Sequence, residues 1–107
     1  MPQIKHAVLM RFKPSTSGQK VREIFAALAG LRRVIPGLLD FSGGPYSSTE
    51  GLQQGFTHGF VMTFADAASR DGYIPHPEHE KVKQLIVPEL EGGIKGVIAF
   101  DWEHQPG

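Results

Sequence analysis

The stretch FTHGFVMTF, residues 56–64, has the clearest strand pattern in the chain. Its side chains alternate between two sets, as expected of a β-strand, where successive side chains point to opposite faces of a sheet. One set is aromatic and apolar with a single histidine: Phe56, His58, Phe60, Met62 and Phe64. The other set is smaller and more polar. The stretch therefore predicts a strand with one face in the core.

Three further segments are predicted as strands: residues 3–12, 38–42 and 94–102. In the first of these the core-facing set again contains one histidine: Ile4, His6, Val8, Met10 and Phe12. The connection at residues 43–55 is polar and rich in glycine, which is typical of a surface loop. Two interpretations remain open for it, a lid over a site and a long hairpin loop, and the hairpin is favoured.

Helices are expected between these strands. Thr16 and Gln19 resemble a capping box, so the first helix should begin there. Its apolar positions recur every three or four residues and form one stripe: Val21, Ile24, Phe25, Leu28, Leu31 and Ile35. A short helix over residues 66–72 and a longer one over residues 78–90 come later, with Pro77 at the favourable first position. Pro88 should kink or fray the end of that last helix.

The order of these elements is β-α-β-β-α-β, without an internal repeat or a linker. This order predicts the α+β, ferredoxin-like arrangement, an antiparallel sheet with its helices on one face. The chain has 107 residues and is expected to form a single domain over residues 1–107.

The second face of the predicted sheet is more apolar than a face in contact with water should be. Ala7, Leu9 and Val61 lie on it, and the last strand is apolar on both sides over residues 97–100. A second copy of the chain would cover this surface. We therefore expect a homodimer that packs sheet against sheet.

Composition excludes several functional classes. Without any cysteine, the chain can form neither a disulfide framework nor a thiolate site, which favours a reducing compartment and a cytoplasmic protein. Eleven basic residues balance eleven acidic ones, so nucleic acid is not an expected partner. No apolar run approaches the length needed to cross a membrane.

Four side chains are candidates for chemistry: His6, His58, Tyr73 and His79. A single histidine on an apolar strand face is commonly a hydrogen-bonded core residue, but here two strands each carry one. His79 lies in the first turn of the last helix and shares an apolar stripe with Val82. Because a helix N-terminus disfavours a cation, its imidazole should be neutral and able to accept a proton. Tyr73 is interpreted either as its partner or as a boundary tyrosine.

A neutral histidine and a phenol in a dry pocket suit chemistry next to a carbonyl group. The histidine removes a proton from carbon while the hydroxyl stabilises the developing oxyanion. A metal site is not expected, since His76 and His79, with Glu78 between them, lack further ligands. Two other enzyme classes are less favoured: tautomerases, which use an N-terminal proline such as Pro2 would supply, and cofactor-free monooxygenases using Trp102 or His58.

The chain resembles the stress-responsive dimeric A/B barrel (Dabb) family in three segments: Ile4–His6, Gly55–His58 and Tyr73–His79. The resemblance extends from Ile4 to Trp102. It implies a ferredoxin-like fold whose two sheets form a barrel in a dimer. The best-defined enzyme of that family closes a linear polyketide by intramolecular aldol condensation without a metal or cofactor.

The resemblance also implies roles for individual residues. It makes His79 the base and Tyr73 its partner in positioning the substrate. The expected substrate-binding residues line the pocket: His6, His58, Phe25, Phe60 and Met62. Two hypotheses follow, a cofactor-free cyclase or lyase acting on a polyketide-like or other carbonyl compound, and a non-catalytic stress-responsive dimer that binds a small apolar or aromatic ligand.

Overall fold

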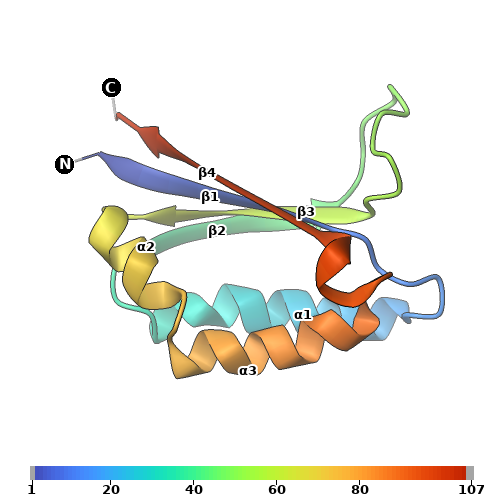
Figure 1. Cartoon of the computed structure of the whole chain (residues 1–107), viewed down its shortest axis with the longest axis horizontal. Helices are drawn as coiled ribbons and strands as arrows, with labels where there is room; N and C mark the ends of the chain where they lie inside the picture. Colours follow the sequence, from blue (N-terminus) through green and yellow to red (C-terminus); the bar gives the residue numbers. More distant parts are fainter. Residues whose placement is uncertain (1, 106–107) are drawn as a thin grey trace.

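The computed structural model describes residues 2–105 and contains one antiparallel sheet of four strands in the order β2-β3-β1-β4 (Figure 1). The strands are β1 (Gln3–Met10), β2 (Leu38–Pro45), β3 (His58–Phe64) and β4 (Val97–His104). In the central register, Val8 of β1 lies opposite Phe60 of β3 and Ala99 of β4. With two long helices on one face, this is the ferredoxin-like α+β fold expected from the order of the elements.

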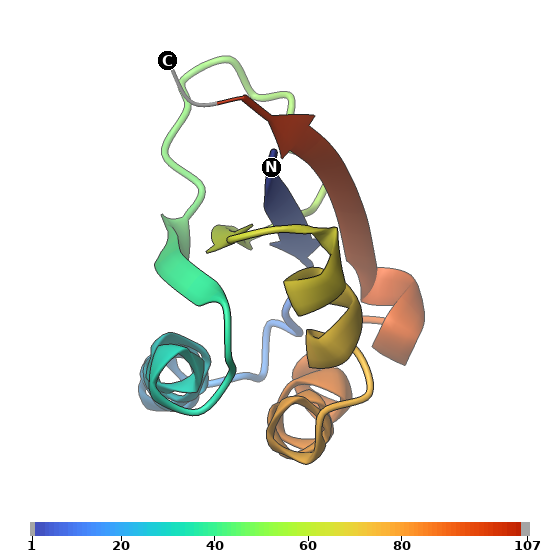
Figure 2. The same ribbon diagram turned by 90° about the vertical axis from the view of Figure 1, so that its left-hand side faces the viewer.

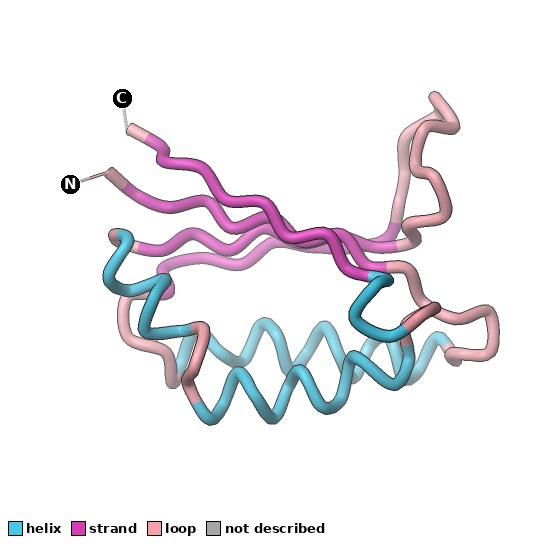
Figure 3. The backbone as a smooth tube through the Cα atoms, in the orientation of Figure 1, coloured by secondary structure: helices cyan, strands magenta, loops and turns pink. Residues whose placement is uncertain are grey.

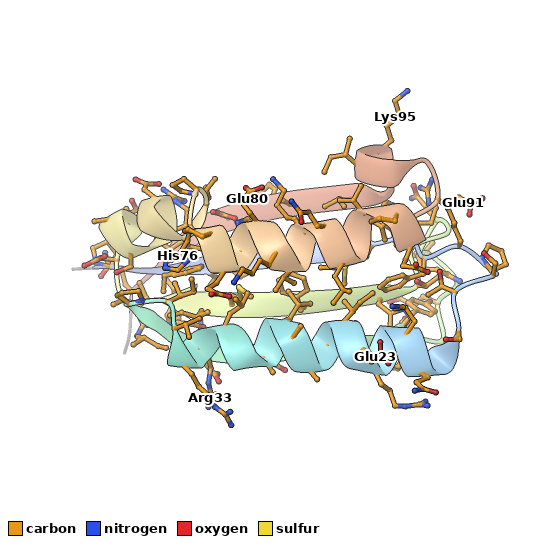
Figure 4. All side chains as sticks on the ribbon, turned by 90° about the horizontal axis from the view of Figure 1, so that it is seen from below. Glu23, Arg33, His76, Glu80, Glu91 and Lys95 are labelled. Carbon is orange, nitrogen blue, oxygen red and sulfur yellow. The ribbon has the colours of Figure 1, made fainter. Side chains whose placement is uncertain are left out.

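The helices are α1 (Gly18–Gly30), α2 (Ala67–Tyr73) and α3 (Pro77–Ile86), with short 3₁₀ turns at Leu31–Arg33, Val87–Glu89 and Gly93–Gly96. Figure 2 shows α1 and α3 side by side beneath the sheet, with α2 between α3 and the sheet at one end. Seen from the helix side, polar and charged side chains lie on the outer surfaces of these two helices, and Arg33 and Lys95 project away from the rest of the protein (Figure 4). Helices and strands thus form two layers (Figure 3).

The predicted helix boundaries were partly wrong. Ser17, not Thr16, caps α1, since its hydroxyl accepts a hydrogen bond from the Lys20 amide at 3.0 Å. The hydroxyl of Thr16 is instead 3.1 Å from the carbonyl oxygen of Glu89, to which it donates. At α3, Pro77 occupies the first turn as predicted, and the ring of His76 accepts from the Glu78 amide at 3.1 Å.

The ends of two other elements also differ from the prediction. Helix α3 stops at Ile86 because Pro88 lacks an amide hydrogen, and a 3₁₀ turn replaces the last α-helical turn. Residues 93–96 form another 3₁₀ turn, so β4 begins at Val97 rather than at residue 94. Strand β2 continues to Pro45, beyond the predicted end at residue 42.

The core lies between the sheet and the two long helices. The side chains of β1 and β3 that were predicted to face inward are buried there, except that His6 and His58 are only partly buried, and α1 contributes Ile24 and Leu28. The buried members of these two strands are Ile4, Val8, Met10, Phe60, Met62 and Phe64. Tyr73, at the end of α2, is only 2% exposed.

No helix among residues 2–105 covers the opposite face of the sheet (Figure 1). Leu9 and Ile98 are paired across β1 and β4 and are both exposed, as are Phe100 and Trp102 further along β4. Phe100 is 67% exposed. The connection between β2 and β3, residues 46–57, rises on this open side and joins two antiparallel neighbours, as a hairpin loop does. Within the described residues, no helix is long and apolar enough to span a membrane.

Candidate functional site

A cavity of about 230 Å³ lies between the sheet and α3. Its polar lining side chains are His6, Tyr73, His79 and Lys83. All others are apolar: Val8, Met10, Leu28, Phe60, Ile74, Val82, Ile86, Val87, Ile94, Val97 and Ala99. The cavity is therefore an apolar chamber with a few polar groups, which is the usual composition of a small-molecule site.

Tyr73 and His79 form a stacked pair at one wall of this cavity. Their ring centroids are 4.0 Å apart and their planes differ by 28°. Tyr73 ends α2 and His79 lies in the first turn of α3, so the short connection through Pro75 brings the two rings together. The phenol also contacts Phe64, with ring centroids 5.2 Å apart.

The hydroxyl of Tyr73 is available to a ligand. Burial raises the pKa of Tyr73, and no hydrogen bond or charge among residues 2–105 contributes to the shift. In the same part of the chain, the one completely buried side-chain N or O atom without a partner is Nε of Arg11. The Tyr73 hydroxyl therefore retains some open surface, although the side chain as a whole is almost fully enclosed. Buried polar groups normally have partners, so the open side of this hydroxyl is a place for one.

The His79 ring is held in one tautomer. Its Nδ1 is 2.9 Å from the carbonyl oxygen of Ile74, which can only accept, so Nδ1 carries the hydrogen and Nε2 carries the lone pair. Burial lowers the pKa of His79, and the neighbouring Lys83 and His6 side chains act in the same direction, whereas the Ile74 carbonyl and Glu80 oppose the shift. The imidazole is thus neutral at pH 7 and able to accept a proton.

On strand β1, across the cavity from α3, His6 belongs to a second polar group. Its Nδ1 is 2.6 Å from Oδ1 of Asp101, and the other carboxylate oxygen is 2.9 Å from the guanidinium of Arg70. Desolvation acts to raise the pKa of Asp101, but the hydrogen bonds from His6 and Arg70 prevail and hold this pKa below its usual value. The ring of His6 lies 5.9 Å from that of Tyr73, between centroids.

The structure brings four of the expected site residues together at this cavity: His6, Phe60, Tyr73 and His79. The expectation that His58 converges with them was wrong. His58 pairs with Met10 at one end of β3, whereas His6 pairs with Met62, four residues further along, which corresponds to roughly 13 Å of strand. Alternation predicted the common face correctly but says nothing of position along the strand.

His58 has other neighbours, and with it two further predicted lining residues fall outside the cavity. The His58 ring packs edge-on against Phe12 and tilted against Phe25, while its Nδ1 is 2.9 Å from the Thr57 hydroxyl. Phe25 therefore contacts His58 rather than the cavity. Met62 does not line the cavity because it is fully enclosed in the core.

Sequence reasoning missed Asp101, Arg70 and Lys83. For Asp101 a signal existed, since alternation along β4 puts it on the same face as Val97 and Ala99. Trp102, considered for oxygenase chemistry, is on the open face, outside the cavity. In the described part of the chain, no group of three His, Asp or Glu residues could hold a metal ion.

The fold and this cavity define a class of protein, the ferredoxin-like α+β proteins with an apolar cavity between sheet and helices. A family model described as the stress responsive A/B barrel domain (Dabb) matches residues 4–104. The chain belongs to this family.

Individual relatives agree with this assignment. The chain is 31% identical over 100 residues to the stress-response A/B barrel domain-containing protein HS1 of Arabidopsis thaliana, covering 94% of this chain and 88% of that protein. It is 28% identical to olivetolic acid cyclase of Cannabis sativa, covering 71% of this chain and 75% of the cyclase. A crystal structure from Jannaschia sp. CCS1, described as a dimeric ferredoxin-like protein of unknown function, superposes with a TM-score of 0.85 at 30% identity and covers 94% of this chain and 98% of that chain.

Proposed function

We propose that this protein is a cofactor-independent cyclase or lyase that acts on a small carbonyl compound, with His79 as the base and Tyr73 as its hydrogen-bonding partner. One observation carries the proposal: a neutral imidazole with a free Nε2 is stacked at 4.0 Å on a buried phenol that makes no hydrogen bond to residues 2–105. Both groups line one apolar cavity. The similarity to a cyclase over 71% of the chain also supports a cyclase or lyase function.

The arrangement provides for each proton in an aldol cyclisation. Nε2 of His79 takes a proton from the carbon next to a carbonyl, and the carbonyl oxygen becomes an enolate oxygen, to which the Tyr73 hydroxyl donates a hydrogen bond. A tyrosine hydroxyl is protonated at pH 7, and burial, which raises the pKa of Tyr73, keeps it protonated at higher pH as well. The enolate carbon then attacks a second carbonyl of the same molecule, and the resulting alkoxide takes the proton back from His79.

The volume of the cavity limits the substrate. About 230 Å³ is below the roughly 300–1,000 Å³ of sites for drug-sized ligands. A compact aromatic or short polyketide-like compound fits this space better than a long chain. Phe60 and the aliphatic side chains around it supply apolar contacts, and His6 supplies a polar one.

The test is a thermal-shift screen with aromatic and polyketide-like carbonyl compounds, followed by mass spectrometry for conversion of each compound that binds. His79→Ala should abolish conversion without unfolding the protein. His104→Ala is the matched control, since His104 is exposed at the end of β4 and outside the cavity. Conversion that survives in His79→Ala would refute the assignment of the base.

The second candidate is a non-catalytic dimer that holds a small apolar or aromatic ligand. The dominance of apolar groups in the cavity lining favours it, because such a lining suffices for binding. Binding of several compounds without conversion of any, with equal affinity in His79→Ala, would support this candidate over the enzyme.

We also propose that the open sheet face packs against a second copy of the chain. Exposed apolar patches of this kind mark interaction surfaces, and here Leu9, Ile98, Phe100 and Trp102 form one across β1 and β4. The similar protein from Jannaschia is described as dimeric. Light scattering coupled to gel filtration should give twice the mass of one chain.

A further inference from the structure

Three charged or titratable side chains from three different elements meet beside the cavity. Arg70 of α2 donates from a terminal guanidinium nitrogen to Oδ2 of Asp101 at 2.9 Å. Asp101 of β4 lies directly opposite His6 of β1 in the strand register, and its Oδ1 is 2.6 Å from Nδ1 of His6. All three side chains are at most one-quarter exposed, so solvent screens these contacts only partly.

We propose that Arg70 and Asp101 are positioning residues that hold His6 with its hydrogen on Nδ1, so that the lone pair on Nε2 accepts a hydrogen bond from a hydroxyl or enol of the substrate. The site would then select compounds that carry a carbonyl for the Tyr73 hydroxyl and a nearby hydroxyl or enol for His6. This inference rests on the proposed function of the same cavity and names its substrate class: hydroxy-carbonyl compounds and enolised 1,3-dicarbonyl compounds.

The tautomer follows from the partners of Asp101. A carboxylate can only accept hydrogen bonds, and the pKa of Asp101 is held below its usual value, so the group is ionised near pH 7. Nδ1 of His6, at 2.6 Å, must therefore be the donor. In the neutral ring, a nitrogen bound to a hydrogen has no free lone pair, so acceptance falls to Nε2.

Nε2 of His6 is also the atom left open to a ligand. It makes no hydrogen bond to any described residue (2–105), and it is not among the completely buried atoms without partners. His6 lines the cavity, and its ring is 5.9 Å from Tyr73 and 6.3 Å from Phe60, between centroids. Apart from Lys83, whose ammonium group is paired with Glu80 at 3.3 Å, the cavity therefore presents one donor, the Tyr73 hydroxyl, and two acceptors, the free nitrogens of His6 and His79.

Arg70 would fix the orientation of a side-chain amide at position 101, and this makes the proposal testable by substitution. In Asp101→Asn, the amide oxygen must face the Arg70 donor, so the amide NH₂ faces Nδ1 of His6. Nδ1 of His6 would then have to accept a hydrogen bond, so its hydrogen would move to Nε2. Replacing a carboxylate that orients a histidine by an amide can change the tautomer in this way. In the double variant Arg70→Met with Asp101→Asn, the amide is free to turn its oxygen toward His6, and the original tautomer should return.

The measurement is the pair of ¹⁵N chemical shifts of the His6 ring, which distinguish the two tautomers and require no turnover. We expect the Nδ1–H form in the wild type, the Nε2–H form in Asp101→Asn and a return to Nδ1–H in the double variant. Arg32→Met is the matched control, since Arg32 forms an exposed pair with Asp40 at 3.4 Å, and it should change nothing. An unchanged tautomer in folded Asp101→Asn would overturn the proposal, as would an Nε2–H wild type.

Binding of two probes completes the test. 3-Hydroxyacetophenone offers a carbonyl and a hydroxyl, whereas 3-methoxyacetophenone cannot donate. The wild type should bind the first roughly 2- to 10-fold more tightly, the value of one hydrogen bond, and Asp101→Asn should lose this preference. Equal affinities in the wild type would overturn the substrate class. Correct tautomers and preferences without conversion of any compound would instead refute only the proposed enzyme activity.

Discussion

Replacement of Tyr73 by phenylalanine separates a functional hydroxyl from a structural one. The side chain is 2% exposed, and its hydroxyl makes no hydrogen bond to residues 2–105, so removing one oxygen breaks no contact with the protein. We expect Tyr73→Phe to change the free energy of unfolding by less than about 0.5 kcal/mol, or to stabilise the fold slightly. A structural hydroxyl that left its partner unsatisfied would cost about 1–3 kcal/mol instead.

Catalysis should respond in the opposite way. Loss of one hydrogen-bond donor to an oxyanion lowers kcat by about 10²- to 10³-fold, or about 2.7–4 kcal/mol of transition-state stabilisation. The two assays are urea unfolding followed by tryptophan fluorescence, and turnover of the compound found in the screen. Tyr46→Phe is the matched control, because the other tyrosine accepts a hydrogen bond from the Gly51 amide at 2.9 Å in the loop and should leave kcat unchanged.

Two results would refute this reasoning. A loss of stability above about 1 kcal/mol in Tyr73→Phe would show that the hydroxyl is bonded within the folded protein. An unchanged kcat would show that the hydroxyl does not contact the reacting atoms, and the role of Tyr73 would be packing alone.

Three further predictions concern pH, assembly and the core. Because burial lowers the pKa of His79, the folded protein binds fewer protons at this residue than the unfolded chain does. Both kcat/KM and the contribution of His79 to the free energy of unfolding should therefore persist at pH 6.5 and decline below it. An NMR titration of His79 with a midpoint above 6.5 would contradict this. Phe100→Glu on the open face should raise the dimer dissociation constant at least tenfold, as measured by analytical ultracentrifugation. Val34→Glu, at an exposed apolar position outside the strands, should not change it. Equal dissociation constants for the two variants would exclude this face as the interface. Leu28→Ala removes a 1%-exposed side chain that also lines the cavity, so it should cost about 2–5 kcal/mol in urea unfolding, and a cost below 1 kcal/mol would contradict the packing described.

Much of the fold could be predicted because it depends on local patterns. Alternation over residues 56–64 identifies the strand and its inward face, and Phe60, Met62 and Phe64 are buried as that pattern requires. The position of Pro77 at the start of α3 was equally predictable, since proline is preorganised for the first helical turn. Element ends were less accurate, as at the start of α1, because either of two adjacent hydroxyls could cap the helix and a contact with the distant Glu89 engages Thr16, which leaves Ser17 as the cap.

The candidate site was only partly predictable. Short spacing between Tyr73 and His79 was visible along the chain, and the structure stacks these two rings. The supposed convergence of His58 with them was wrong, because the face of a strand is a local property whereas its register against a neighbour depends on the whole sheet. Asp101 and Arg70 were missed for the same reason, since they are 31 residues apart and meet only when β4 pairs with β1.

By itself, the sequence determined the alternation of strands, the order of elements, the apolar second face and the absence of any thiol chemistry. Those properties depend on side-chain type and spacing, which the chain carries whether or not it is folded. Only the tertiary structure decided which polar groups share the cavity, which nitrogen of His6 and His79 bears the hydrogen, and which histidine stands apart. These depend on distances of a few ångströms between segments remote in sequence, which are set when strand register and helix packing are established together.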